Sequence, residues 1–127
     1  MFDHVELPVS DVDASVAFYR RVLSPLGIEQ TASGDYAEFG ALSLSQREPR
    51  GRLHFALVAE SREQVDAFHR AGVEGGYRDN GPPGLREYAR DYYAAYLLDP
   101  DGHNVEAVHR SAGTRAGWSW LRRGRVP

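Results

Sequence analysis

Apolar and polar residues alternate in several short stretches of the chain, and two longer segments carry apolar residues at the spacing of an amphipathic helix. In the first stretch the apolar side chains fall on one face of a predicted strand, whereas His4 and Glu6 fall on the opposite face. Glycine, proline and helix-capping residues separate the stretches. The predicted elements are, in order, a strand over 3–9, a helix over 13–23, strands over 28–31, 36–39, 41–45 and 53–59, a helix from its cap at Ser61 to its end at Gly72, a short strand near 73–77, a loop over 75–90, and strands over 92–98 and 104–108.

This order of elements occurs twice along the chain. His4 stands at the start of a strand and Phe18 follows fourteen residues later on a helix, and His54 and Phe68 repeat the arrangement 50 residues further on. A repeat at a fixed spacing indicates tandem copies of one structural unit. We therefore predict an α+β fold of two tandem βαβββ modules that form a cup-shaped mixed sheet with the helices outside. The expected organisation is a single domain over 1–110, with modules over 1–46 and 53–110, a linker over 47–52, and a C-terminal arm over 111–127.

Composition and charge exclude several classes of function. The 127 residues suffice for one domain with its own core, and the net charge of −3 argues against a nucleic-acid partner. There is no cysteine, which excludes thiol nucleophiles and thiolate metal sites, and all fifteen basic residues are arginine, which excludes a lysine Schiff base. No apolar run is long enough to cross a bilayer, and the start of the chain lacks the pattern of a secretory signal. We expect a cytoplasmic protein with no membrane partner.

Three side chains with metal-binding chemistry lie on the polar faces of predicted strands. His4, His54 and Glu106 all point away from the apolar face of their strands, so they can converge if the modules form one concave sheet. Two imidazoles and one carboxylate form a facial triad that can bind Fe(II), Mn, Ni, Co or Zn and leaves coordination positions open. The alternative is that each is an ordinary strand residue. His103, in the predicted turn between the last two strands, is expected at the surface.

Three segments resemble the vicinal oxygen chelate superfamily, which includes glyoxalase I, extradiol dioxygenases, fosfomycin-resistance thiol transferases and bleomycin-resistance proteins. They are His4-Val-x-Leu-x-Val-Ser-Asp with Ser15-Val-x-Phe-Tyr, His54-Phe-Ala-Leu, and Leu98-Asp-Pro-Asp-Gly-His-Asn-Val-Glu106. Together they extend over nearly all of the predicted domain. The resemblance implies paired modules around a divalent metal, frequent homodimers, and metal ligation by His4, His54 and Glu106.

The resemblance also separates the branches of the superfamily. Glyoxalase I has a fourth ligand on the last strand of its first module, where the repeat places Ser43, and serine is a poor metal ligand. True glyoxalase I activity is therefore disfavoured. The dioxygenases and thiol transferases carry a tyrosine ten residues before the glutamate ligand, and Tyr96 stands at that spacing from Glu106. The thiol transferases have a hydroxyl residue where this chain has Glu6, an acidic group that would repel a phosphonate and argues against fosfomycin.

These observations lead to an expected role for each remaining candidate. Tyr96 would hydrogen-bond a substrate oxygen, Glu6 would act as a base, and Ser43, Arg86 and Tyr88 would contact the substrate. The expected function is that of a divalent-metal-dependent enzyme acting on a small oxygenated substrate, either glyoxalase/lyase-like or dioxygenase-like. The alternative is a metal-free protein that sequesters a ligand, as bleomycin-resistance proteins do. A third interpretation is a dimer that buries a vestigial site.

Overall fold

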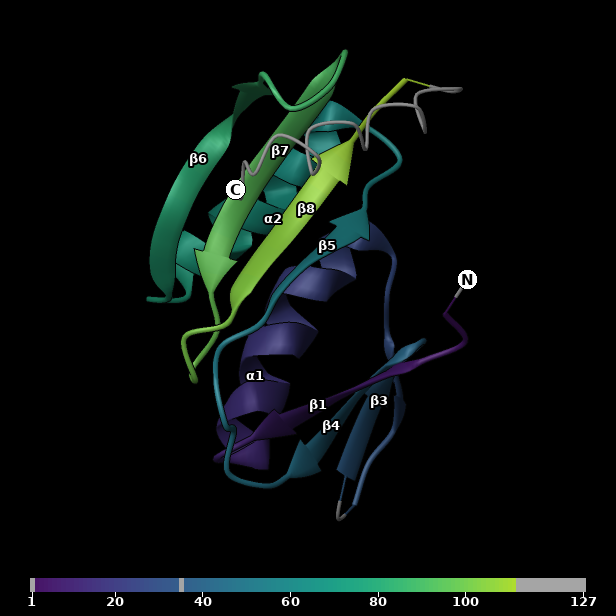
Figure 1. The fold of residues 1–127 in the computed structure, drawn as a ribbon, viewed down its shortest axis with the longest axis vertical. Helices are drawn as coiled ribbons and strands as arrows, with labels where there is room; N and C mark the ends of the chain where they lie inside the picture. Colours follow the sequence, from purple (N-terminus) through teal and green to yellow (C-terminus); the bar gives the residue numbers. More distant parts are fainter. Residues whose placement is uncertain (1, 35, 112–127) are drawn as a thin grey trace.

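The computed structural model describes residues 2–34 and 36–111, and these form two successive βαβββ modules (Figure 1). The first module consists of β1 (Val5–Val9), α1 (Val12–Leu23), the short 3₁₀ helix η1 (Ser24–Leu26), β2 (Gln30–Ala32), β3 (Tyr36–Phe39) and β4 (Leu42–Gln46). The second consists of β5 (His54–Val58), α2 (Arg62–Glu74), β6 (Arg78–Arg86), β7 (Tyr92–Leu98) and β8 (Asn104–His109). The predicted α+β fold of tandem βαβββ modules is confirmed. Neither helix of this described part is long and apolar enough to cross a membrane.

Each module forms its own four-stranded mixed sheet. The first sheet has the order β1-β4-β3-β2 and the second has the order β5-β8-β7-β6. In both sheets the first strand of the module pairs in parallel with the last, and the remaining pairs are antiparallel. Glu6 pairs with Ser43 in the first sheet, and Ala56 pairs with Glu106 in the second. The repeat therefore places Ser43 and Glu106 at equivalent positions, as the sequence predicts.

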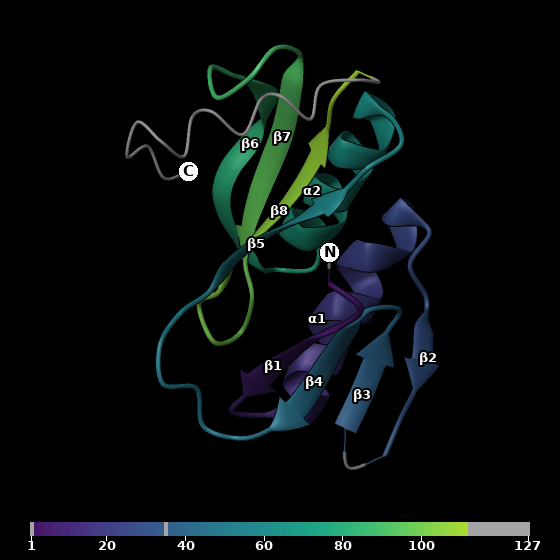
Figure 2. The same ribbon diagram turned by 45° about the vertical axis from the view of Figure 1, so that its right-hand side comes forward.

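One face of each sheet is covered by a helix. α1 packs against β3 and β4, α2 packs against β6, β7 and β8, and the two helices contact each other (Figures 1 and 2). Apolar side chains from both helices and both sheets form one continuous core, so burial of apolar surface holds the modules together. We call the opposite face of each sheet its outer face. Because side chains alternate along a strand, the polar residues between the core positions lie on the outer faces.

The helix boundaries follow from local hydrogen bonds and from one close approach. The Asp11 carboxylate caps α1 and the Ser61 hydroxyl caps α2, each by accepting a backbone N–H. The predicted end of α2 at Gly72 is wrong, because the helix continues through Gly72 to Glu74. A Cβ at residue 72 would lie 2.4 Å from Leu97 Cδ1, so glycine allows α2 to approach β7 closely. The short strand predicted near 73–77 is therefore absent, since α2 occupies its start.

Most of the segment predicted as a loop is a strand. β6 is nine residues long and lies at the edge of the second sheet, paired with β7. An edge strand tolerates Pro82 and Pro83, which lack a backbone N–H, and its register shifts on both sides of Gly81. The prediction of a loop over 75–90 was wrong because glycine and proline are as compatible with an irregular edge strand as with a loop.

Candidate functional site

His54 and Glu106 form a contact on the outer face of the second sheet. Glu106 is completely buried on β8, and its Oε1 lies 3.1 Å from Nε2 of His54 at the start of β5. The other ring nitrogen of His54, Nδ1, donates to the carbonyl oxygen of Asn104 at 3.2 Å. The structure thus brings together two of the three predicted metal ligands.

The hydrogen bond from His54 to Asn104 fixes the position of the proton on the imidazole, and therefore which ring atom faces Glu106. With its proton on Nδ1, the neutral imidazole of His54 directs a lone pair from Nε2 towards a carboxylate oxygen, and two acceptors repel each other unless a cation lies between them. Consistent with this, the Glu106 carboxylate raises the pKa of His54, although burial opposes the effect and the Asn104 carbonyl supports it. Glu106 Oε1 receives no hydrogen bond from any described residue, although it is buried.

A divalent metal ion fits this arrangement as well as a proton does. Ligand distances of about 2.0–2.2 Å at a right angle place two ligand atoms roughly 3 Å apart, close to the observed separation. A backbone carbonyl that accepts the second ring N–H is also the usual support of a histidine ligand. His54 and Glu106 therefore have the donor chemistry, the spacing and the surrounding contacts of a metal-binding pair.

Two tyrosines of β7 surround Glu106. Tyr92 donates its hydroxyl hydrogen to Glu106 Oε2. Tyr96 is the cross-strand partner of Glu106, and its ring centroid lies 6.2 Å from that of His54. Burial is the main cause that raises the pKa of both tyrosines, so their hydroxyls remain protonated and can act as donors. The structure places Tyr96 where the sequence predicts it, but the sequence analysis missed Tyr92.

Arg86 and Tyr88 contact the same two tyrosines. The guanidinium of Arg86, at the end of β6, lies 5.3 Å from the centroid of the Tyr96 ring and donates to the Pro82 carbonyl at 2.6 Å. The Tyr88 ring meets the Tyr92 ring edge-on, with 5.4 Å between centroids. Both predicted substrate contacts therefore lie on the side of the second sheet that carries His54. We call the group formed by His54, Tyr96 and Glu106 the second half-site, and we include in it their neighbours Arg86, Tyr88 and Tyr92.

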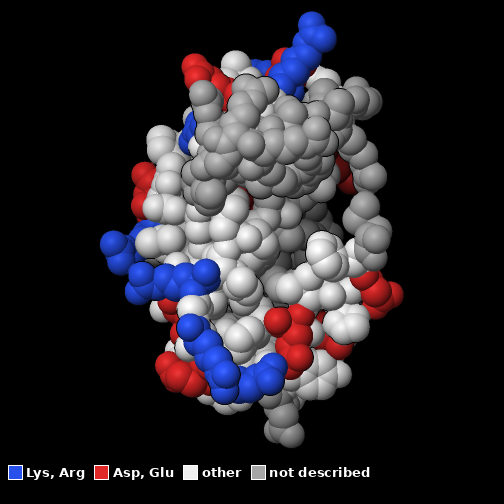
Figure 3. All heavy atoms as spheres, in the orientation of Figure 1, with Lys and Arg blue, Asp and Glu red and all other residues white. Residues whose placement is uncertain are grey.

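The other predicted residues lie on the outer face of the first sheet. His4, Glu6 and Ser43 line an open pocket of about 540 Å³, whose lining residues are Asp3, His4, Glu6, Tyr36, Glu38, Gly40, Ala41 and Ser43. His4 Nδ1 donates to Asp3 Oδ1 at 2.9 Å, and this bond with the negative charge of Asp3 raises the pKa of His4. Figure 3 shows acidic side chains gathered over the lower part of this view, which the first module occupies, beside a group of basic ones. We call His4, Glu6 and Ser43 the first half-site.

A single chain does not assemble the predicted triad. Over residues 2–34 and 36–111, the histidine nitrogens and carboxylate oxygens of His4, His54 and Glu106 do not come within 4.8 Å of one another as a group. The lining of the first pocket belongs entirely to the first module, whereas His54 and Glu106 lie on the second sheet. The predicted C-terminal arm, apart from Ser111, lies outside the described residues.

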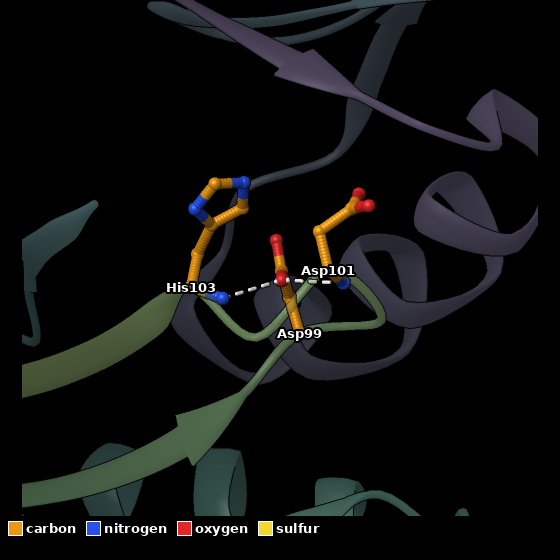
Figure 4. A group of neighbouring side chains, drawn as sticks. All are labelled: Asp99, Asp101 and His103. Atoms are coloured by element: carbon orange, nitrogen blue, oxygen red, sulfur yellow. Dashed lines mark hydrogen bonds between the residues drawn. The ribbon is translucent and has the colours of Figure 1, made fainter. Parts of the chain in front are cut away.

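A different group of side chains has ligand spacing within the chain. Asp99, Asp101 and His103, in the turn between β7 and β8, have ligand atoms within 4.8 Å of one another (Figure 4). Asp99 Oδ2 accepts from the Tyr19 hydroxyl at 2.6 Å, and Oδ1 accepts the backbone N–H groups of Asp101 and His103 at 2.9 and 2.8 Å. Both oxygens of Asp101 accept from Ser10, which follows β1.

These hydrogen bonds favour a structural role over metal binding. His103 Nδ1 accepts the backbone N–H of Leu53 at 2.9 Å, so the proton of the neutral ring lies on Nε2 and leaves no second lone pair for a metal. Through Tyr19 and Ser10 the turn is tied to α1 and to the end of β1. The prediction that His103 lies at the surface is wrong, because His103 is buried, with only 1% exposed.

The sequence and the fold both match known proteins. Residues 1–107 match the family model of the Glyoxalase/Bleomycin resistance protein/Dioxygenase superfamily. A metallothiol transferase FosB of Shouchella clausii is 34% identical over 119 residues, which cover 84% of this chain and 77% of the relative. A glyoxalase/bleomycin resistance protein from Albidiferax ferrireducens superposes with a TM-score of 0.71 at 34% identity, over 87% of this chain and 98% of the other. A lactoylglutathione lyase from Agrobacterium tumefaciens shares the fold, with a TM-score of 0.66 at 21% identity over 86% of this chain and 92% of the other.

Proposed function

The chain belongs to the Glyoxalase/Bleomycin resistance protein/Dioxygenase superfamily, and we propose that it is a divalent-metal-dependent enzyme acting on a small oxygenated substrate in the cytoplasm. His4, His54 and Glu106 would hold the ion. The observation that carries this proposal is the contact of 3.1 Å between His54 Nε2 and the buried Glu106 Oε1, a spacing that suits a metal ion between the two atoms as well as it suits a proton. The metal dependence indicated by the name of the metallothiol transferase relative supports it.

We further propose that the site is completed in a homodimer, by His4 of the partner subunit. His4 is absent from the second half-site of its own chain, and each half-site belongs to a sheet whose first strand, β1 or β5, is an edge strand. β5 exposes an apolar side chain at its end, Val58, which is 80% exposed. Pairing the outer faces of unlike sheets from two chains would cover these edges and form two equivalent sites, as a closed two-fold dimer requires.

Within such a site, the residues of both half-sites have distinct tasks. A bound divalent ion would supply Lewis acidity to the oxygen atoms of the substrate. The protonated hydroxyl of Tyr96 would donate a hydrogen bond to a substrate oxygen, and Glu6 would accept a proton. Arg47 Nη2 lies 3.0 Å from Glu6 Oε1 and forms an exposed ion pair with that carboxylate. Arg86, stacked on Tyr96, provides positive charge for an anionic part of the substrate.

The chemistry of the first half-site limits the reaction. Ser43 occupies the position equivalent to Glu106, and a serine hydroxyl is a poor metal ligand, so the proposal has three protein ligands with positions left for substrate. Lyase-like or isomerase-like proton transfer requires Glu6 as the base. Dioxygenase-like ring cleavage requires iron as the bound metal. Bound iron therefore directs the assays towards oxygenation, and bound Mn, Ni, Co or Zn directs them towards proton transfer.

The first test is the metal content of the protein after incubation with Fe(II), Mn, Ni, Co or Zn and removal of free ions. We expect about one ion per chain in the wild type, as for a single closed set of protein ligands, and loss of the ion in the Glu106→Gln variant. Glu74→Gln, the same change at the exposed end of α2, should retain the ion. A wild-type protein that stays empty with every metal would contradict the proposal and favour the metal-free, ligand-sequestering alternative.

A mixing experiment tests the dimer. The His4→Ala and Glu106→Gln variants should each bind no metal, because each homodimer lacks a ligand in both sites. After the two variants exchange subunits, a mixed dimer contains one intact site, so about a quarter of the wild-type metal binding should return. If all three ligands came from one chain, no mixture would restore binding.

A further inference from the structure

Tyr92 is the buried residue of the second half-site to which the proposed function assigns no task. It is 2% exposed, lies at the start of β7, and donates its hydroxyl hydrogen to Glu106 Oε2. The cross-strand partner of Glu106 is Tyr96, four residues further along β7. Tyr92 and Glu106 therefore reach each other along the surface of the sheet. Ala94, between the two tyrosines, pairs with Val108, and its small side chain leaves the path between Tyr92 and Glu106 open.

Two contacts of the Tyr92 ring hold its hydroxyl towards Glu106. The edge of the Tyr88 ring packs against one side of it, and the guanidinium of Arg110 lies 5.2 Å from its centroid. These ring contacts do not depend on Glu106, so the hydroxyl is placed before any ion binds. A hydrogen bond from a hydroxyl to a carboxylate is among the stronger ones that proteins form.

The two oxygens of Glu106 consequently have different surroundings. Oε2 receives the Tyr92 hydroxyl, whereas Oε1 faces His54 Nε2 and receives no hydrogen bond from the described residues. We infer that Tyr92 is a positioning residue that restricts Glu106 to metal ligation through a single oxygen, Oε1. This inference rests on the proposed function, in which Glu106 is a metal ligand. Ligation through one oxygen of Glu106 uses one coordination position fewer than ligation through both oxygens. The position left open would be available to a substrate that binds the metal through two neighbouring oxygen atoms.

The test compares the wild type with Tyr92→Phe, which keeps the ring and removes the hydroxyl. Tyr93→Phe is the matched control, because it removes a hydroxyl that bonds Asp66 elsewhere on the same strand. Metal affinity is measured by competition with a coloured chelator, and coordination number by the visible absorption of the Co(II) protein. We expect Tyr92→Phe to lose about 10- to 100-fold in affinity, as is typical when a supporting hydrogen bond to a ligand is removed. Its Co(II) absorption should weaken, as coordination by both oxygens increases the coordination number, and Tyr93→Phe should match the wild type.

A measurement on the wild type keeps the inference testable if Tyr92→Phe does not fold. The hydrogen-bonded hydroxyl proton of Tyr92 should give a downfield NMR signal in the chelator-treated protein that persists when Zn is added. Loss of that signal on Zn binding would show that Oε2 moves to the metal and would overturn the inference. So would a folded Tyr92→Phe protein with wild-type affinity and Co(II) spectrum. A wild type that binds none of Fe(II), Mn, Ni, Co and Zn overturns the proposed function itself, and the inference with it, so the two failures are distinguishable.

Discussion

Replacement of Tyr19 by phenylalanine removes one buried hydroxyl from the contact between the modules. Tyr19 is completely buried on α1, and its hydroxyl oxygen lies 2.6 Å from Asp99 Oδ2 in the turn between β7 and β8. Phenylalanine retains the ring packing against Phe18, which lies edge-on at 4.8 Å, so the hydrogen bond is the main loss. Burial raises the pKa of Asp99, while the Tyr19 hydroxyl and two backbone N–H groups act in the opposite direction. The variant therefore leaves a poorly solvated carboxyl with fewer donors.

The expected loss of unfolding free energy in Tyr19→Phe follows from the burial of the hydrogen bond and the charge of Asp99. A hydrogen bond to a charged group contributes about 1.5–3 kcal/mol to the free energy of unfolding when its loss leaves a buried partner unsatisfied. For a domain of this size that corresponds to a melting temperature lower by roughly 6 to 15 °C. The Tyr93→Phe variant provides a matched control, because the Tyr93 hydroxyl also lies 2.6 Å from a carboxylate, that of Asp66, but the pair is only partly buried. Water can replace that bond, so its loss should cost about 0.5 kcal/mol.

Urea unfolding of the chelator-treated proteins, followed by far-ultraviolet circular dichroism, measures both free energies. The structural interpretation of the turn would be refuted if Tyr19→Phe lost no more stability than Tyr93→Phe. It would also be refuted if divalent ions stabilised the Glu106→Gln protein and Asp101→Asn removed that effect. The turn would then bind a cation through the carboxylates that the structure engages in hydrogen bonds.

Two further predictions concern stability. In chelator-treated protein, His54 should contribute stability that is fully present below its unfolded pKa of about 6.5 and is lost as pH rises through the pKa that Glu106 raises. The difference in unfolding free energy between wild type and His54→Gln should therefore be larger at pH 6 than at pH 9, and an equal difference at both would contradict the assignment. Gly72→Ala should destabilise the protein by about 1 kcal/mol, because overpacking against Leu97 costs about 1–3 kcal/mol and the gain in helix propensity offsets about 1 kcal/mol. Gly51→Ala, where a Cβ would meet nothing within 4 Å, serves as the control in the same urea experiment.

The parts of the site that follow from strand periodicity were predictable from the sequence. Alternation along β8 places Glu106 opposite the core residues Val105 and Ala107, and the repeat places Ser43 at the equivalent position of β4. These conclusions need only local patterns, because side chains change faces at every residue of a strand. The same reasoning could have identified Tyr92, which lies on the same face of β7 as Tyr96. The alternation along β7 indicated the face on which Tyr92 lies. It did not indicate the contact with Glu106, because Tyr92 lies four residues before Tyr96, the cross-strand partner of Glu106, and the contact depends on the direction of both side chains.

The features that were not predicted depend on tertiary contacts. Gly72 has the local signature of a helix end, and only its closeness to Leu97 explains why glycine occurs inside α2. His103 stands in a turn, where histidine is usually exposed, but it is buried and accepts the backbone N–H of Leu53, 50 residues earlier in the chain. β6 contains two prolines and is a strand because β7 lies beside it. In each case the deciding contact is with another element of the fold, and local propensity carries no information about it.

The separation of the two half-sites within one chain has a thermodynamic consequence for the proposed enzyme. If His4 of the partner subunit supplies the third ligand, an ion that binds the dimer more tightly than the monomer must strengthen the dimer by the same free energy. Glu106 and His54 are already in contact, so the ion binds weakly to a monomer and its full affinity appears only on assembly. Chelation should therefore weaken dimerisation in analytical ultracentrifugation, whereas the His4→Ala protein, lacking the bridging ligand, should dimerise equally with and without metal. A wild-type dimer whose dissociation constant is unchanged by chelation would show that its metal ligands do not bridge the subunits, whatever activity the protein has.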